Sequence, residues 1–111
     1  MASMVLIYST FGSEKDAQKV AHSLLQKKLV GCAVMFPAKS MYWWKGSIDM
    51  TRETILLLKT TKSLAVKAKK ELAQKHPYET PCILDWSAGV NDSYLNWLLD
   101  ATEISQKRMK R

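Results

Sequence analysis

An unbroken run of four large apolar residues, Ile-Leu-Leu-Leu at 55–58, places the strongest constraint on how this chain can fold. The run lies inside a stretch, 53–61, whose aliphatic character predicts a strand. Successive side chains of a strand point to opposite faces of the sheet, so the run puts bulky apolar groups on both faces. We therefore expect both faces of the sheet to be covered.

Three further segments have the apolar, β-branched character of strands. The second of them contains Pro37, which is expected to interrupt the strand, and then turns back near 46–48 into the strand that carries the apolar run. The three segments cover 4–10, 32–45 and 82–86.

Three helices are predicted from cap residues and from apolar stripes at helical spacing. Ser13 caps the first, residues 61–63 cap the second, which ends before Pro77, and Asn91 or Asp92 begins the last. The order is βαββαβ plus a C-terminal helix. Right-handed crossovers then place both main helices on one face of a four-stranded antiparallel sheet, the ferredoxin-like α+β arrangement.

Two helices cover only one face of such a sheet, and the terminal helix is too short to cover the other. We infer that copies of the chain pack together through the second face, with the strand edges paired in the assembly. Aromatic residues are enriched at interfaces, so the segment 41–44 is expected to contribute. The residues expected at this interface are Tyr42, Trp43, Trp44 and Leu57.

The charge and composition exclude several classes of protein. Of the net charge of +7, four charges belong to a basic tail, 104–111, leaving +3 for the predicted core, about 4–103; this does not indicate nucleic-acid binding. A chain of 111 residues predicts one domain. Two cysteines make no disulfide framework, and no apolar run suits a signal peptide or a membrane span. We expect a soluble, cytoplasmic protein with no membrane partner.

The densest polar chemistry lies at 76–81, His-Pro-Tyr-Glu-Thr-Pro, followed by Cys82. We call residues 76–82 the junction, because its two prolines end the preceding helix and the chain continues extended. His76, Glu79 and Cys82 carry an imidazole, a carboxylate and a thiol, donors that suit copper or another divalent cation. The structural alternative is that His76 caps the carbonyls of the preceding helix and that Glu79 pairs with a lysine of a neighbouring copy.

A ligand cleft is expected beside these residues. Trp44 offers a ring on which a ligand can stack, and Tyr78 belongs to the junction itself. Lys59, at the end of its strand, is expected beside the junction, where it would meet an anionic ligand or pair with Glu79. The expected lining of the cleft is therefore Trp44, Lys59 and Tyr78.

Four blocks of sequence occur in a distinctive order: SMYWWKG at 40–46, ETILLLKT at 53–60, HPYETP at 76–81 and YLNW at 94–97. In this order the chain resembles the CutA divalent-cation-tolerance family over about residues 5–102. The resemblance implies a ferredoxin-like subunit in a homotrimer, similar in architecture to PII signalling proteins, with clefts between subunits. It also implies a response to metal ions and binding of copper or another divalent cation.

The chain departs from that family at two positions. Ser9 or Tyr8 stands where some members carry a cysteine proposed to bind copper, and Lys75 stands where some carry a second histidine. Transfer of the family's copper site to this chain is therefore partial.

Other functions are open at this point. A PII-like small-molecule sensor, or a structural trimer without a dedicated metal site, fits the same fold. An RNA-binding βαββαβ domain is disfavoured, because the strand at 53–60 is aliphatic and offers no ring for a base to stack on. Catalysis has little support, since no nucleophile elbow and no phosphate loop is present in the sequence. We expect a binding protein and not an enzyme.

Overall fold

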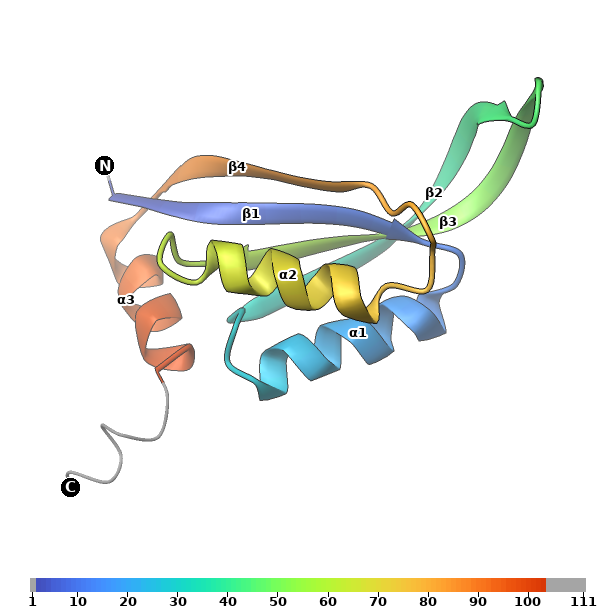
Figure 1. The fold of residues 1–111 in the computed structure, drawn as a ribbon. Coiled ribbons are helices and arrows are strands. Elements are labelled where there is room, and N and C mark those ends of the chain that lie inside the picture. The colour runs from blue at the N-terminus through green and yellow to red at the C-terminus, as the bar shows by residue number, and fades with distance from the viewer. Residues whose placement is uncertain (1, 104–111) are drawn as a thin grey trace.

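The computed structural model describes residues 2–103 and has the predicted ferredoxin-like fold (Figure 1). The four strands form one antiparallel sheet in the order β2-β3-β1-β4. Helices α1 and α2 lie on one face of it, and α3 lies at the end near the N-terminus. The elements are β1 (Ala2–Phe11), α1 (Glu14–Gln26), β2 (Cys32–Trp44), β3 (Ser47–Thr60), α2 (Ala65–Lys75), β4 (Ile83–Val90) and α3 (Asp92–Ala101).

The helix boundaries follow local hydrogen bonds. The Ser13 hydroxyl accepts from the backbone N–H of Asp16 at 3.1 Å, as an N-cap of α1 does. The cap predicted for α2 at 61–63 is wrong. The hydroxyls of Thr61 and Ser63 bond each other at 3.2 Å, and α2 begins at Ala65 without a side-chain cap.

The strands are longer than predicted. Strand β2 continues through Pro37, which pairs with Thr54. Proline has no N–H to donate, but β2 is an edge strand and half of its N–H groups point away from β3, so the strand tolerates it. Strand β3 begins at Ser47, not near 53, and β4 runs from Ile83 to Val90, beyond the expected end at 86. The basic tail predicted at 104–111 lies outside the described residues.

A long hairpin of β2 and β3 extends away from the body of the subunit (Figure 1). Its two-residue turn has positive φ at Lys45 (50°) and Gly46 (83°), the geometry that matches the twist of the flanking strands. Residues 41–50 are all exposed. The hairpin gives the subunit extents of 57 × 29 × 21 Å and a radius of gyration of 15.5 Å. A compact domain of this length would have about 13 Å.

The face of the sheet that α1 and α2 cover holds the main core. Residues from both layers are fully enclosed there, with no exposed surface. Lys27, the C-cap residue of α1, also pairs with Glu71 of α2 at the rim. The largest enclosed side chains are Ile7, Phe11, Leu24, Leu56, Leu58 and Leu72.

The opposite face, which we call the open face, is only partly covered. Helix α3 packs against its end through Met4, Val90 and Leu98. Leu57 and Ile55 are half-buried there, on the side opposite to Leu56 and Leu58. Apolar side chains of β2 and β4 beside them are exposed: Val34 by 37%, Phe36 by 43%, Leu84 by 51% and Trp86 by 44%. Among residues 2–103, no helix combines the length and the hydropathy needed to cross a membrane.

Candidate functional site

His76 lies at the point where the junction meets the end of β1. The residue is 7% exposed, and its ring stacks on Phe11 with ring centroids 4.1 Å apart. Nε2 lies 2.9 Å from the carbonyl oxygen of Thr10, and Nδ1 accepts from the backbone N–H of Tyr78 at 3.1 Å. A carbonyl oxygen only accepts, so Nε2 carries the proton and the ring is neutral. Both ring nitrogens are engaged by the protein.

The capping role considered for the His76 side chain is not the one observed. Its backbone N–H donates to Leu72 O at 2.9 Å and ends α2, while the ring bonds Thr10 of β1 instead. Burial lowers the pKa of His76, and the Thr10 carbonyl and the charge of Asp16 oppose that shift. The imidazole therefore joins the junction to the sheet in its uncharged form.

Tyr78 forms a second attachment of the junction. Its hydroxyl donates to Glu53 Oε2 at 3.0 Å, and its ring lies beside the ring of His76, although the residue is 37% exposed. A Cβ on Gly12 would lie 3.3 Å from the Tyr78 hydroxyl oxygen, so glycine gives the ring room here. Burial, followed by the hydrogen bond and charge of Glu53, raises the pKa of Tyr78 to about 12. The phenol is therefore neutral at physiological pH.

A third attachment closes the junction at its far end. The buried hydroxyl of Ser9 donates to the carbonyl oxygen of Cys82 at 2.8 Å. Ser9 and Thr10 of β1 thus hold the two ends of the junction, and Glu53 of β3 holds its middle. These bonds fix the path of the chain between them.

The junction, β1 and the hairpin line a pocket of about 670 Å³, which we call the cleft. Its described lining contains two carboxylates, Glu53 and Glu79, and no Lys, Arg or His. Four aromatic side chains also face it. The lining is Tyr8, Thr10, Ser40, Met41, Tyr42, Trp44, Glu53, Tyr78, Glu79, Thr80 and Cys82.

The structure brings some of the predicted site residues together and separates others. Trp44, Tyr78, Glu79 and Cys82 share the cleft, while His76 lies behind it with its nitrogens occupied. Lys59 is not beside the junction. It pairs in register with Leu6 and Cys32, near the opposite end of the sheet, and its ammonium lies 5.2 Å from the Tyr94 ring centroid.

The residues predicted at an interface lie on two surfaces. Leu57 is on the open face, and Tyr42, Trp43 and Trp44 are in the exposed part of the hairpin. Trp43 is 73% exposed, far more than a side chain that packs within its own subunit. The Tyr42 hydroxyl bonds Thr51 across the hairpin at 3.3 Å.

Sequence reasoning missed Tyr8 and Glu53 as parts of the cleft. Tyr8 pairs with Leu57 and Leu84, which places it on the open face next to the junction. Glu53 pairs with Ala38, near the place where the hairpin joins the body of the sheet. The alternation of side chains along β1 could have shown that Tyr8 points to the open face. The contact between Glu53 and Tyr78 could not be found in the same way, because it depends on how distant segments of the chain pair.

The residues needed for a preformed metal site are not gathered in one place. Within 2–103, no three His, Cys, Asp or Glu side chains converge as metal ligands would. Cys32 and Cys82 are both free thiols, and only Cys82 reaches the cleft. The cleft therefore offers carboxylates, a thiol and aromatic rings to a ligand.

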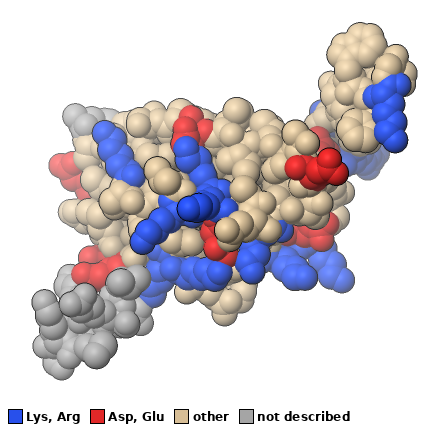
Figure 2. Space-filling model, viewed as in Figure 1, with Lys and Arg blue, Asp and Glu red and all other residues tan. Residues whose placement is uncertain are grey.

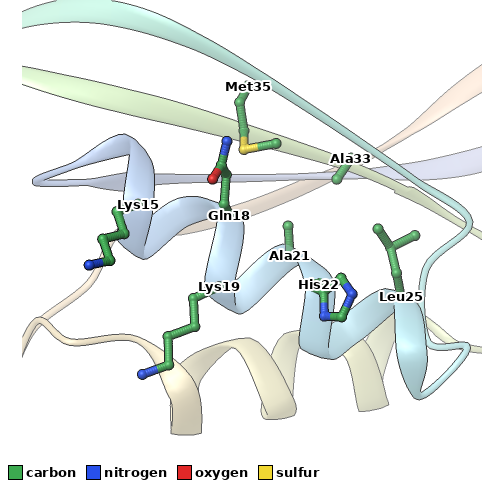
Figure 3. A pocket seen from close by; sticks show the side chains of 8 residues that line it. All are labelled: Lys15, Gln18, Lys19, Ala21, His22, Leu25, Ala33 and Met35. Carbon is green, nitrogen blue, oxygen red and sulfur yellow. The ribbon is translucent and has the colours of Figure 1, made fainter.

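A second pocket, of about 610 Å³, has the opposite charge. It lies between α1 and β2, with Lys15, Lys19 and His22 on its rim and Ala33 and Met35 on its floor (Figure 3). Basic side chains, which are lysines in both helices, gather over α1 and α2 in the view of Figure 2. His22 is exposed to solvent on α1. The helical side of the subunit is basic and the cleft is acidic.

Known proteins share this fold and are similar to this chain in sequence. The model of the CutA1 divalent ion tolerance protein family matches residues 5–101. The divalent-cation tolerance protein CutA of Thermotoga maritima is 39% identical over 99 residues, covering 88% of this chain and 98% of that protein.

Solved structures agree with the sequence match. The crystal structure of divalent ion tolerance protein CutA1 from Ehrlichia chaffeensis has a TM-score of 0.90 at 33% identity, covering 94% of this chain and 99% of that one. CutA1 from Pyrococcus horikoshii has a TM-score of 0.87 at 33% identity, covering 91% of this chain and all of that one (100%). The chain therefore belongs to the CutA1 divalent ion tolerance protein family.

Proposed function

We propose that this chain forms a homotrimer that contributes to the tolerance of divalent cations, and that the cleft is its cation-binding site. Membership of the CutA1 family supports the link to divalent cations. The observation that carries the proposal is the position of the acidic cleft next to an apolar face that one subunit leaves exposed.

The open face supports self-association. Val34, Phe36, Leu84 and Trp86 form an apolar surface together with half-buried Leu57, and contiguous surfaces of this kind are typical of interfaces. The outer strands, β2 and β4, also have unpaired edges within the subunit. Packing copies of the chain together removes both features from water.

The hairpin supports a cleft at the boundary between subunits. Its exposed end extends beyond the body, where it would reach a neighbouring copy, and Tyr42 and Trp44 of this end line the cleft. Trp43 is available to the same neighbour. In this arrangement the neighbour completes the wall of each cleft.

Within the cleft we propose Glu53, Glu79 and Cys82 as the groups that contact a cation. Glu79 and Cys82 are exposed, and Glu53 retains one carboxylate oxygen besides the one that Tyr78 bonds. We assign His76 a positioning role, because its ring holds Thr10 and Tyr78. Binding, and not catalysis, is the function we propose, in the cytoplasm, where thiols such as Cys32 and Cys82 stay reduced.

The test measures assembly and metal uptake on the same preparation. Light scattering after size exclusion should give the mass of three chains, and calorimetry should show uptake of Cu²⁺ and of redox-inert Zn²⁺. Glu79→Gln and Cys82→Ser should each weaken uptake by about tenfold or more, since each removes a ligand. Cys32→Ser is the matched control, because Cys32 is a free thiol outside the cleft.

Two results would contradict the proposal. A stable single subunit at micromolar concentration would remove the assembly. Equal metal uptake by Glu79→Gln, Cys82→Ser and the control would remove the cleft as the metal site. His76→Ala should alter uptake less than either ligand variant, because both nitrogens of its ring already bond the protein.

A further inference from the structure

The charge of the cleft is the opposite of the charge of the chain. The protein carries a net charge of +7, yet the described lining of the cleft holds Glu53 and Glu79 without a basic side chain. An anionic ligand such as a nucleotide would meet two carboxylates there, and none of the described lining residues supplies a cation. The cleft therefore selects positive charge.

The walls of the cleft are aromatic as well as acidic. Tyr8, Tyr42, Trp44 and Tyr78 face it from β1, the hairpin and the junction. Aromatic faces attract cations, and Trp does so most strongly. Trp44 already does this within the subunit, since the ammonium of Lys45 lies 5.7 Å from its ring centroid.

These two properties favour an organic cation over a bare metal ion. A metal ion needs three or more donor atoms converging on one point, and the described residues hold no such group of His, Cys, Asp or Glu. An alkylammonium ion spreads its charge over methyl or methylene groups that pack against rings. It needs carboxylates nearby but no fixed coordination geometry.

The size of the cleft and its fixed walls fit a small molecule. Its volume is about 670 Å³, within the range of pockets that enclose small ligands. Tyr78 is held by Glu53, and the junction that carries Glu79 is attached to β1 at both ends. Tyr78, Glu53 and the segment that carries Glu79 are therefore positioned before a ligand arrives.

We infer that the ligand of the cleft is a small organic ammonium ion, held by the rings of Tyr42, Trp44 and Tyr78 and neutralised by Glu53 and Glu79. The inference rests on the proposed function, since it names the class of cation that the cleft prefers. It makes the cleft a sensor of amines, with metal ions as weaker ligands of the same carboxylates.

Full-length protein should be titrated with tetramethylammonium chloride and with tert-butanol, a neutral molecule of similar shape, at constant ionic strength. Calorimetry and tryptophan fluorescence report binding. We expect tetramethylammonium to bind at least tenfold more tightly than tert-butanol. Comparable binding of the two molecules, or no binding of either, would overturn the inference.

Variants locate the site. Glu79→Gln should weaken tetramethylammonium binding by about threefold to tenfold, and Trp44→Leu by a similar factor, as loss of a carboxylate or of a ring under a cation predicts. Glu14→Gln is the matched control, because it removes one negative charge from the first turn of α1, outside the cleft. An equal loss in Glu14→Gln and Glu79→Gln would place the binding elsewhere and overturn the inference.

The proposed function and this inference fail differently. A trimer that takes up Cu²⁺ or Zn²⁺ in the cleft but does not prefer tetramethylammonium to tert-butanol defeats only the inference. A single subunit that still binds tetramethylammonium through Glu79 supports the inference and defeats the proposed assembly. Because Trp44 is also a predicted interface residue, the molecular mass of the Trp44→Leu protein must be measured together with its ligand binding. Glu79 is exposed, so the effect of Glu79→Gln on tetramethylammonium binding is independent of assembly.

Discussion

The two faces of the sheet differ although the same four-residue run supplies both. Leu56 and Leu58 point toward α1 and α2 and have no exposed surface, whereas Ile55 and Leu57 point to the open face and are half-buried. The first face is completed by the chain's own helices. The second has α3 at one end and apolar surface over the rest. One strand thus contributes to folding through one set of side chains and offers another set for assembly.

The largest effect should come from breaking the helix-covered face. Leu58→Asp places a carboxylate in a fully enclosed apolar site, where the lost burial and the charge together cost about 5 kcal/mol or more. Such a loss equals the whole stability of many domains. Far-ultraviolet circular dichroism should show an unfolded chain. A cooperative thermal transition near that of the wild type would contradict the difference between the two faces.

The neighbouring residue should separate folding from assembly. Leu57→Asp puts the same carboxylate on the open face, where water reaches it in a single subunit, so the subunit should keep its circular dichroism spectrum and lose its proposed trimer. Leu57→Met is the matched control, because a swap of similar volume is tolerated and costs under about 1.5 kcal/mol. Recovery of a folded trimer from Leu57→Asp would show that the open face is not the interface.

A smaller effect on stability should come from lowering the pH, through His76 where the junction meets β1. The folded-state pKa of His76 is lowered below 6.5, so the unfolded chain binds the proton more readily. Stability is therefore complete above about pH 6.5 and is lost as the pH falls through the lowered pKa, where protonated Nδ1 can no longer accept from Tyr78. The melting temperature measured across this range should fall in the wild type.

Two variants sharpen that measurement. His76→Ala should lower the melting temperature at pH 7 and remove the slope between pH 6.5 and the lowered pKa. His22→Ala, at the only other histidine, should leave the profile unchanged, because His22 is exposed on α1. A slope that survives in His76→Ala would assign the titration to another group.

The fold was predictable because its signals are local. The cap at Ser13, the helical stripes and the apolar run at 55–58 each act within a few residues. The hairpin was underestimated, since residues 47–52 build no core and their polar and apolar alternation is short, with only Ile48 and Met50 apolar. Pro37 was wrongly expected to interrupt its strand, because a proline on an edge strand costs little stability.

The cleft was predictable only in part, because it depends on register. Glu79 and Cys82 follow His76 within one segment, so their proximity was visible in the sequence. Glu53 meets Tyr78, and Thr10 meets His76, across separations of 25 and 66 residues. Lys59 was misplaced because β3 runs the length of the sheet and carries it to the far end.

The tight turn at Lys45 and Gly46 has a mechanical consequence. Both residues have positive φ, so the turn allows one pairing register and the hairpin behaves as a stiff arm. An arm that is already rigid gives up little conformational entropy when it docks. Its side chains therefore arrive at a neighbouring molecule in a fixed pattern, and recognition depends on shape more than on rearrangement.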